Sequence, residues 1–133
     1  RDLIHSENAD KQRLKLIEEC GELASAILKN DIELQKDSLG DVFVVLTILE
    51  AQLGLKLDWS IEKHNKESFY HYMKAIIGSP INYAGYLFPL SEMLNHDLTE
   101  CANLAYNEIK NRKGVTINGT FIKDSTPSDY IMD

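Results

Sequence analysis

Five acidic side chains with helical spacing are the residues of this 133-residue sequence best suited to chemistry. The first group is Glu18, Glu19 and Glu22, and the second is Asp37 and Asp41. Residues three or four apart share a helix face, so the members of each group point the same way. Carboxylates gathered between two helices repel one another unless a cation lies among them, and hard divalent cations prefer oxygen ligands. The spacing therefore indicates a divalent metal site, with an ordinary solvated helix face as the alternative.

The break in helical pattern at Asn30-Asp31 determines where the two acidic groups meet. Glu22 lies eight residues before Asn30 and Asp41 lies nine after Ile32, so at about 1.5 Å per residue both stand roughly 12–14 Å from the turn. If the flanking helices form an antiparallel hairpin, these two carboxylates lie at nearly the same height. The hairpin would therefore gather both acidic groups around one spot.

A glycine stands beside each acidic group. Gly21 and Gly40 both fall inside predicted helices, where glycine costs about 1 kcal/mol relative to alanine. We interpret their missing side chains as room for a close approach of helices or for a ligand.

Helical periodicity runs along the whole chain, and strand signals are scarce. Capping residues predict the element boundaries: Asp31 and Asp97 begin helices, and Gly54 and Gly114 end them. The turn chemistry of Asn118-Gly119 favours a small hairpin. The predicted helices are 11–29, 32–53, one from 58 or 60 to 77, 83–95 kinked or shortened by Pro89, and 98–113, followed by a hairpin within 115–122.

Two apolar patterns bear on how these helices pack. The middle of the second helix, 42–49, is apolar on every side, so other helices of its own chain or a second subunit must surround it. We favour a subunit interface there. The first helix carries a single apolar stripe, which supports its helical assignment, made up of Leu14, Ile17, Gly21, Ala24 and Leu28.

Composition excludes several classes of function. The 21 acidic residues outnumber the 14 basic ones, and a net charge of −7 argues against a nucleic-acid-binding surface built on phosphate neutralisation. The longest uncharged apolar run, 42–49, is far too short to span a membrane. Cys20 and Cys101 are expected to be buried reduced thiols of a cytoplasmic protein. With 44% hydrophobic and 26% charged residues, the chain is typical of one globular domain.

Three blocks of sequence stand in a characteristic order. They are LIEECGELA at 16–24, DSLGDV at 37–42, and AYNEIKNRKG at 105–114 with NGTF at 118–121. Together they resemble the MazG-like all-α nucleoside triphosphate pyrophosphohydrolases of bacteria and their phages. The resemblance covers about 10–54 and 97–123 and implies a single domain at 1–123 with a helical insertion at 55–96, leaving 124–133 as a C-terminal tail.

This resemblance implies a fold and an activity. The fold is an all-α helical bundle with the active site between antiparallel helices, assembled as a homodimer or homotetramer. The reaction is hydrolysis of a (d)NTP to the (d)NMP and pyrophosphate, using Mg²⁺ or Mn²⁺ in its place, as housekeeping of the nucleotide pool.

The same resemblance implies roles for individual residues. Glu19, Glu22 and Asp41 are expected metal ligands, with Asp37 as a fourth. Glu18 and Glu22 are the expected catalytic residues, acting on the attacking water. The residues expected to bind the substrate phosphates are Asn107, Lys110 and Arg112.

One position departs from the family pattern. The second family motif is Glu-x-x-Asp, and Ser38 stands where the family has Glu. Either Asp37 substitutes with a shorter reach, or Ser38 holds a water on the metal. The alternative functions are a related all-α enzyme, dUTPase-like or a phosphoribosyl-ATP pyrophosphatase, and a catalytically weakened helical oligomerisation module.

Overall fold

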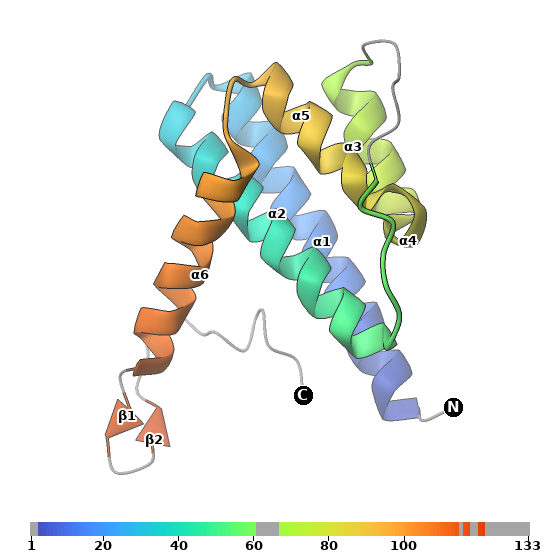
Figure 1. The fold of residues 1–133 in the computed structure, drawn as a ribbon, viewed down its shortest axis with the longest axis vertical. Helices are drawn as coiled ribbons and strands as arrows, with labels where there is room; N and C mark the ends of the chain where they lie inside the picture. The colour runs from blue at the N-terminus through green and yellow to red at the C-terminus, as the bar shows by residue number, and fades with distance from the viewer. Residues whose placement is uncertain (1–2, 61–66, 115, 118–119, 122–133) are drawn as a thin grey trace.

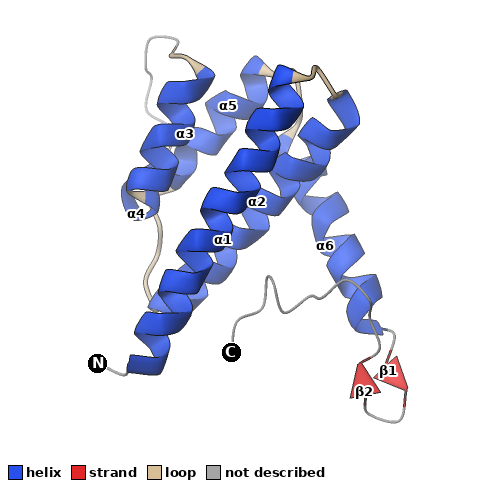
Figure 2. Ribbon diagram, turned by 180° about the vertical axis from the view of Figure 1, so that it is seen from behind, coloured by secondary structure: helices blue, strands red, loops and turns tan. Residues whose placement is uncertain are grey.

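A computed structural model describes residues 3–60, 67–114, 116–117 and 120–121, and the side chains of 8–60 and 67–111. Two long helices, α1 (Leu3–Leu28) and α2 (Ile32–Leu53), form an antiparallel hairpin, and α6 (Leu98–Gly114) packs on α2 (Figure 1). The expected all-α fold is confirmed. Beside α6, β1 (Thr116–Ile117) pairs antiparallel with β2 (Thr120–Phe121). The other side of the hairpin is covered by α3 (Phe69–Gly78), α4 (Pro80–Tyr83), η1 (Ala84–Tyr86) and α5 (Leu87–Met93) (Figure 2).

Capping residues begin and end the helices where the sequence predicts. The backbone N–H of Leu34 donates to Asp31 Oδ1 at 3.1 Å, which caps α2. The N–H of Thr99 donates to Asp97 Oδ1 at 2.9 Å and caps α6 in the same way. Gly54 ends α2 with φ of 68°, the left-handed conformation that glycine adopts without a Cβ penalty.

Three predicted elements differ from the observed ones. α1 begins at Leu3 rather than at 11, and α3 begins at Phe69 rather than at 58 or 60. The strap 55–60 is not helical, and the Leu57 N–H and Trp59 Nε1 in it donate to Glu50 of α2. The predicted helix 83–95 is divided into α4, η1 and α5. Pro89 does not kink a helix, because it lies in the first turn of α5, where an N–H has no intrahelical acceptor.

The apolar stripe on α1 is not the face that the structure buries. Leu14, Ile17 and Leu28 are 66%, 48% and 86% exposed. The buried face includes polar side chains, so hydrophobic periodicity alone does not reveal it. That face comprises Ala9, Gln12, Leu16, Glu19, Cys20, Leu23 and Ala26.

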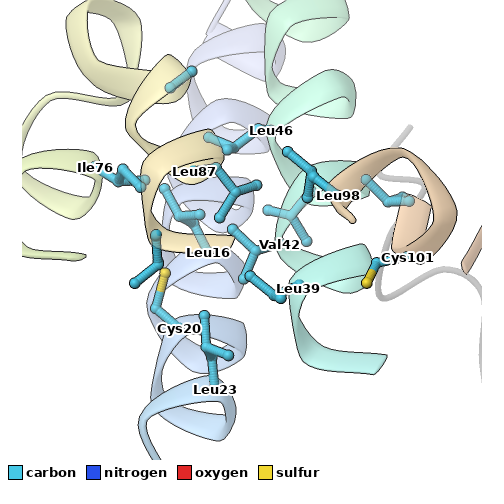
Figure 3. Packing of buried hydrophobic residues seen from close by; sticks show 14 of the residues in the cluster. Leu16, Cys20, Leu23, Leu39, Val42, Leu46, Ile76, Leu87, Leu98 and Cys101 are labelled. Carbon is cyan, nitrogen blue, oxygen red and sulfur yellow. The ribbon is translucent and has the colours of Figure 1, made fainter. Parts of the chain in front are cut away.

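The core lies between the hairpin and the short helices that cover it. Leu16, Leu46, Leu87 and Ile76 converge there from α1, α2, α5 and α3 (Figure 3). The apolar stretch 42–49 of α2 is covered by helices of its own chain, so it no longer argues for a second subunit. Cys20 and Cys101 are both free thiols and both buried, as predicted. None of the helices in the described ranges has the length and apolar character needed to cross a bilayer.

Candidate functional site

Three helices bring acidic side chains to one cavity of about 190 Å³. α1 contributes Glu22, α2 contributes Asp37 and Asp41, and α6 contributes Glu108. The hairpin therefore brings Glu22 and Asp41 together, as the helical rise predicts. The rest of the lining is apolar and consists of Leu34, Leu104 and Ala105.

A close approach of α6 to α2 sets the shape of this cavity. A Cβ placed on Gly40 would collide with the carbonyl oxygen of Cys101 and lie 3.0 Å from Ala105 Cβ. A larger residue would push away the part of α6 that carries Ala105 and Glu108. Gly21 differs, because a Cβ there would meet no described atom within 4 Å. Close helix approach therefore explains Gly40 and does not explain Gly21.

Glu19 is buried in the hairpin and is only 2% exposed. Its Oε2 lies 3.3 Å from Lys15 Nζ, whereas Oε1 has no hydrogen-bond partner among the described residues. Burial, and next the charge of Glu22, raise the pKa of Glu19 above its ordinary value. A buried carboxylate oxygen without a partner is costly, and a bound cation would relieve that cost.

Asp41 is affected by every other acid of the cluster. Burial raises its pKa to about 7, with further contributions, in decreasing order, from Glu19, Glu108, Asp37 and Glu22. The pKa of Asp37 is also raised, first by burial and next by Glu108. These acids repel one another in their ionised forms, and a divalent cation would favour those same forms.

The donors around the cavity suit a hard cation by their chemistry. Within the described ranges, no group of three or more His, Cys, Asp or Glu side chains already stands in position to hold a metal ion. Mg²⁺ usually keeps several waters and binds through one or two carboxylates together with substrate phosphates. Carboxylates facing one cavity, with the orphaned oxygen of Glu19 beside them, fit an ion of that kind.

Glu18, Asn107 and Lys110 do not belong to the described lining of the cavity. Glu18 is exposed and accepts a hydrogen bond from Lys15 Nζ at 2.7 Å. Asn107 and Lys110 are exposed on α6, and neither is among the described residues that line the cavity. Arg112 belongs to the last turn of α6, and its side chain lies outside the described ones.

Ser38, which replaces the family Glu, is buried on α2. It is 1% exposed, and its hydroxyl has no hydrogen-bond partner among the described residues. It does not belong to the described lining of the cavity, whereas the adjacent Asp37 does. The geometry thus favours Asp37 over Ser38 as the second acidic position of α2.

Glu108 is the cavity residue that the sequence prediction lacks. The sequence feature that could have pointed to Glu108 is its place in the block 105–114, one helical turn after Leu104. Nothing local indicates that this turn of α6 meets the acids of α1 and α2. That meeting depends on the close approach at Gly40.

Comparison with known families agrees with this architecture. Residues 7–69 match the model of the MazG nucleotide pyrophosphohydrolase domain, a segment that contains α2 and most of α1. The all-α fold and this match identify the segment as a MazG-type domain, and the resemblance seen in the sequence is confirmed there. The matched segment ends within 55–96, and the interpretation of that stretch as an insertion stays a prediction. The predicted tail 124–133 lies outside the described residues.

The chain is also similar to a phage protein. This relative is the "Uncharacterized 18.2 kDa protein in rep-hol intergenic region" of Haemophilus phage HP1 (strain HP1c1). The two are 48% identical over 52 residues, which are 39% of this chain and 32% of the relative. The chain therefore spans about a third of the length of the curated relative that it matches. No solved structure gives a significant match.

Proposed function

We propose that this protein is a magnesium-dependent nucleoside triphosphate pyrophosphohydrolase, converting a (d)NTP and water to the (d)NMP and pyrophosphate. One observation carries the proposal: acids of the MazG-type segment, Glu22, Asp37 and Asp41, face one cavity beside the buried Glu19. The domain match supports the reaction class. The oxygen donors support a hard divalent cation, Mg²⁺ or Mn²⁺ in its place.

The acidic residues divide into two tasks in this proposal. Glu19, Glu22, Asp37 and Asp41 would hold the cation, which when bound supplies charge neutralisation for the phosphate oxygens. Glu22 also lines the open cavity, so we assign it the orientation and deprotonation of the attacking water. Glu18 is the weaker candidate for that task, because its carboxylate is exposed and engaged by Lys15.

Substrate binding is assigned to the second half of α6. Asn107, Lys110 and Arg112 follow the cavity-lining Ala105 on this helix, within one to two turns. An amide and two cations at this position suit the outer phosphates of a nucleotide. We further propose action on the cytoplasmic nucleotide pool by a homodimer or homotetramer.

The reaction class is tested by product analysis. A panel of ribo- and deoxyribonucleoside triphosphates is incubated with Mg²⁺ and, in parallel, with a chelator. We expect monophosphate and pyrophosphate, formed only with the metal. Diphosphate and orthophosphate would contradict the proposal, and strict preference for dUTP or phosphoribosyl-ATP would indicate one of the related enzymes. Folded protein that turns over none of these substrates would favour the oligomerisation module.

The role of Glu22 is tested against its neighbour one turn away. Loss of a general base typically lowers kcat by about 100-fold or more, which we expect for Glu22→Gln. Glu18→Gln removes the same charge from the same helix and should change kcat by less than about threefold, the order of a surface charge effect. The opposite result would transfer the role to Glu18.

A further inference from the structure

We propose that Glu108 is a further cation-binding residue, so that the metal site is built by three helices and not by the α1–α2 hairpin alone. This inference rests on the proposed function. It adds to the site a residue from outside the segment 7–69 that matches the MazG-type domain.

The position of Glu108 is set by the packing of α6. Glu108 lines the same cavity as Glu22, Asp37 and Asp41. One turn earlier, Ala105 is buried against Gly40, where α6 and α2 approach too closely to admit a side chain. The backbone below Glu108 is therefore anchored, and its exposed side chain lines the cavity.

Exposed acids alone would not indicate a ligand, because water solvates them. The buried Glu19 supplies the independent indication, since its Oε1 is shielded from solvent and has no hydrogen-bond partner among the described residues. Glu19 precedes the cavity-lining Glu22 by one turn of α1, and among the neighbouring charges it raises the pKa of Asp41 most. A positive ligand that reaches Asp41 from the cavity would therefore compensate this buried group as well.

Electrostatic effects agree with a place for Glu108 in the cluster. Among neighbouring charges, Glu108 has the largest effect on the pKa of Asp37 and the second largest on that of Asp41. Its carboxylate lines the same cavity as both acids of α2. In this proposal Glu108 would reach an ion held by Asp37 and Asp41 from the facing helix.

A site that includes Glu108 couples the cation to the helix proposed to bind the phosphates. Glu108 stands between Asn107 and Lys110 on α6. Binding of the ion would orient the Glu108 side chain on this packed turn of α6 before the nucleotide arrives. A site built by the hairpin alone would leave α6 without a contact to the ion.

The test is a titration of the full chain with Mn²⁺ in the absence of nucleotide. Electron paramagnetic resonance measures the concentration of free Mn²⁺ and so gives the Kd. The variants are Glu108→Gln and, as a matched control, Glu100→Gln, which removes the same charge from an exposed position in the first turn of α6. Loss of a metal-site contact typically weakens affinity about 10- to 100-fold, which we expect for Glu108→Gln. Glu100→Gln should change the Kd less than about twofold, as for an exposed surface charge.

Thermal unfolding gives a second readout that needs no catalysis. Addition of Mn²⁺ should raise the unfolding temperature of the wild type and of Glu100→Gln more than that of Glu108→Gln.

The possible failures are distinguishable. If wild type binds Mn²⁺ and Glu108→Gln binds it equally well, Glu108 is no ligand, and the proposed function stands with a two-helix site. If wild type binds no Mn²⁺ yet releases pyrophosphate in chelator, the proposed metal dependence fails together with this inference. If Glu100→Gln weakened Mn²⁺ binding as much as Glu108→Gln, the inference would also be wrong. The loss of one negative charge at any position would then explain both results.

Discussion

Two glutamates of the α1–α2 hairpin are withdrawn from water in different ways. Glu50, near the end of α2, accepts hydrogen bonds at its Oε2 from the backbone N–H of Leu57 at 2.7 Å and from Trp59 Nε1 at 3.3 Å. Glu19, in α1, has one oxygen without any partner among the described residues and lies among further acids. The carboxylate of Glu50 ties down the strap 55–60, whereas that of Glu19 has no comparable structural role.

The surroundings of the two residues continue the contrast. Around Glu50, Trp59 packs against Phe43 with ring centroids 5.2 Å apart and against Phe88 at 6.5 Å. Around Glu19, the nearest charges are mostly of the same sign, and Lys15 is the cation within contact distance. The carboxylate of Glu50 is thus satisfied by donors of the protein itself. The carboxylate of Glu19 lacks such donors and would be stabilised by additional positive charge. That difference supports our proposal that Glu50 stabilises the fold and that Glu19 belongs to a cation site.

The largest effect is expected from Asp41→Asn, which keeps the shape of the side chain but removes a central ligand of the cavity. Loss of such a group should lower the rate of pyrophosphate release by about 100-fold or more. Glu50→Gln is the matched control, and its rate should stay close to that of wild type. An equal loss of pyrophosphate release in Asp41→Asn and Glu50→Gln would contradict separate roles for these two carboxylates.

The next effect concerns the close packing that brings α6 to the cavity. Gly40→Ala should destabilise the fold by about 1–3 kcal/mol, the usual result of overpacking, because its Cβ collides with Cys101. Gly21→Ala should instead stabilise it by about 0.5–1 kcal/mol, since it adds helix propensity and meets no described atom. Chemical denaturation measures both, and a stabilising Gly40→Ala would show that α6 is not held as described.

A smaller effect is expected at the structural end of the hairpin. Glu50→Gln retains an oxygen acceptor for Leu57 N–H but loses its charge, and charge-assisted bonds exceed neutral ones by about 1 kcal/mol. The free energy of unfolding should fall by about that amount. Asp41→Asn in chelator should change it in the opposite direction, because repulsion is relieved there. If both variants changed the free energy of unfolding in the same direction, Glu50 and Asp41 would not differ in the way described.

The most gradual effect is on the pH dependence of stability. The pKa of Asp41 is raised in the folded protein from 3.8 to about 7, so between these values the folded state binds more protons than the unfolded state. Stability of the metal-free protein should therefore fall as pH rises from about 4 to about 7 and level off above that range. Thermal unfolding in chelator checks this slope, which Asp41→Asn should reduce. A metal-free wild type whose stability rises between these pH values would contradict the raised pKa of Asp41.

Much of the fold follows from short-range chemistry in the sequence. Asp31 and Asp97 cap helices as predicted because a side-chain oxygen reaches an N–H only two or three residues away. The common height of Glu22 and Asp41 follows from the fixed rise of a helix on either side of one turn. The two acidic groups were thus locatable without any tertiary information.

The face that α1 buries was not predictable in this way. Gln12 is buried because its Nε2 donates to the carbonyl of Val45 at 3.3 Å, and Glu19 is buried among the acids of the hairpin. Both make the buried face look polar, while Leu14 and Leu28 make the exposed face look apolar. Periodicity measures hydrophobicity and cannot register a partner on another helix.

The sequence by itself determined the two hairpin helices and α6, the caps at Asp31 and Asp97, and the two acidic groups, because these depend on interactions within a few residues of the chain. Only the tertiary structure decided that α6 lies against Gly40 and that Glu108 faces Asp37 and Asp41. That contact joins residues more than sixty positions apart, and its geometry depends on the packing of the whole core.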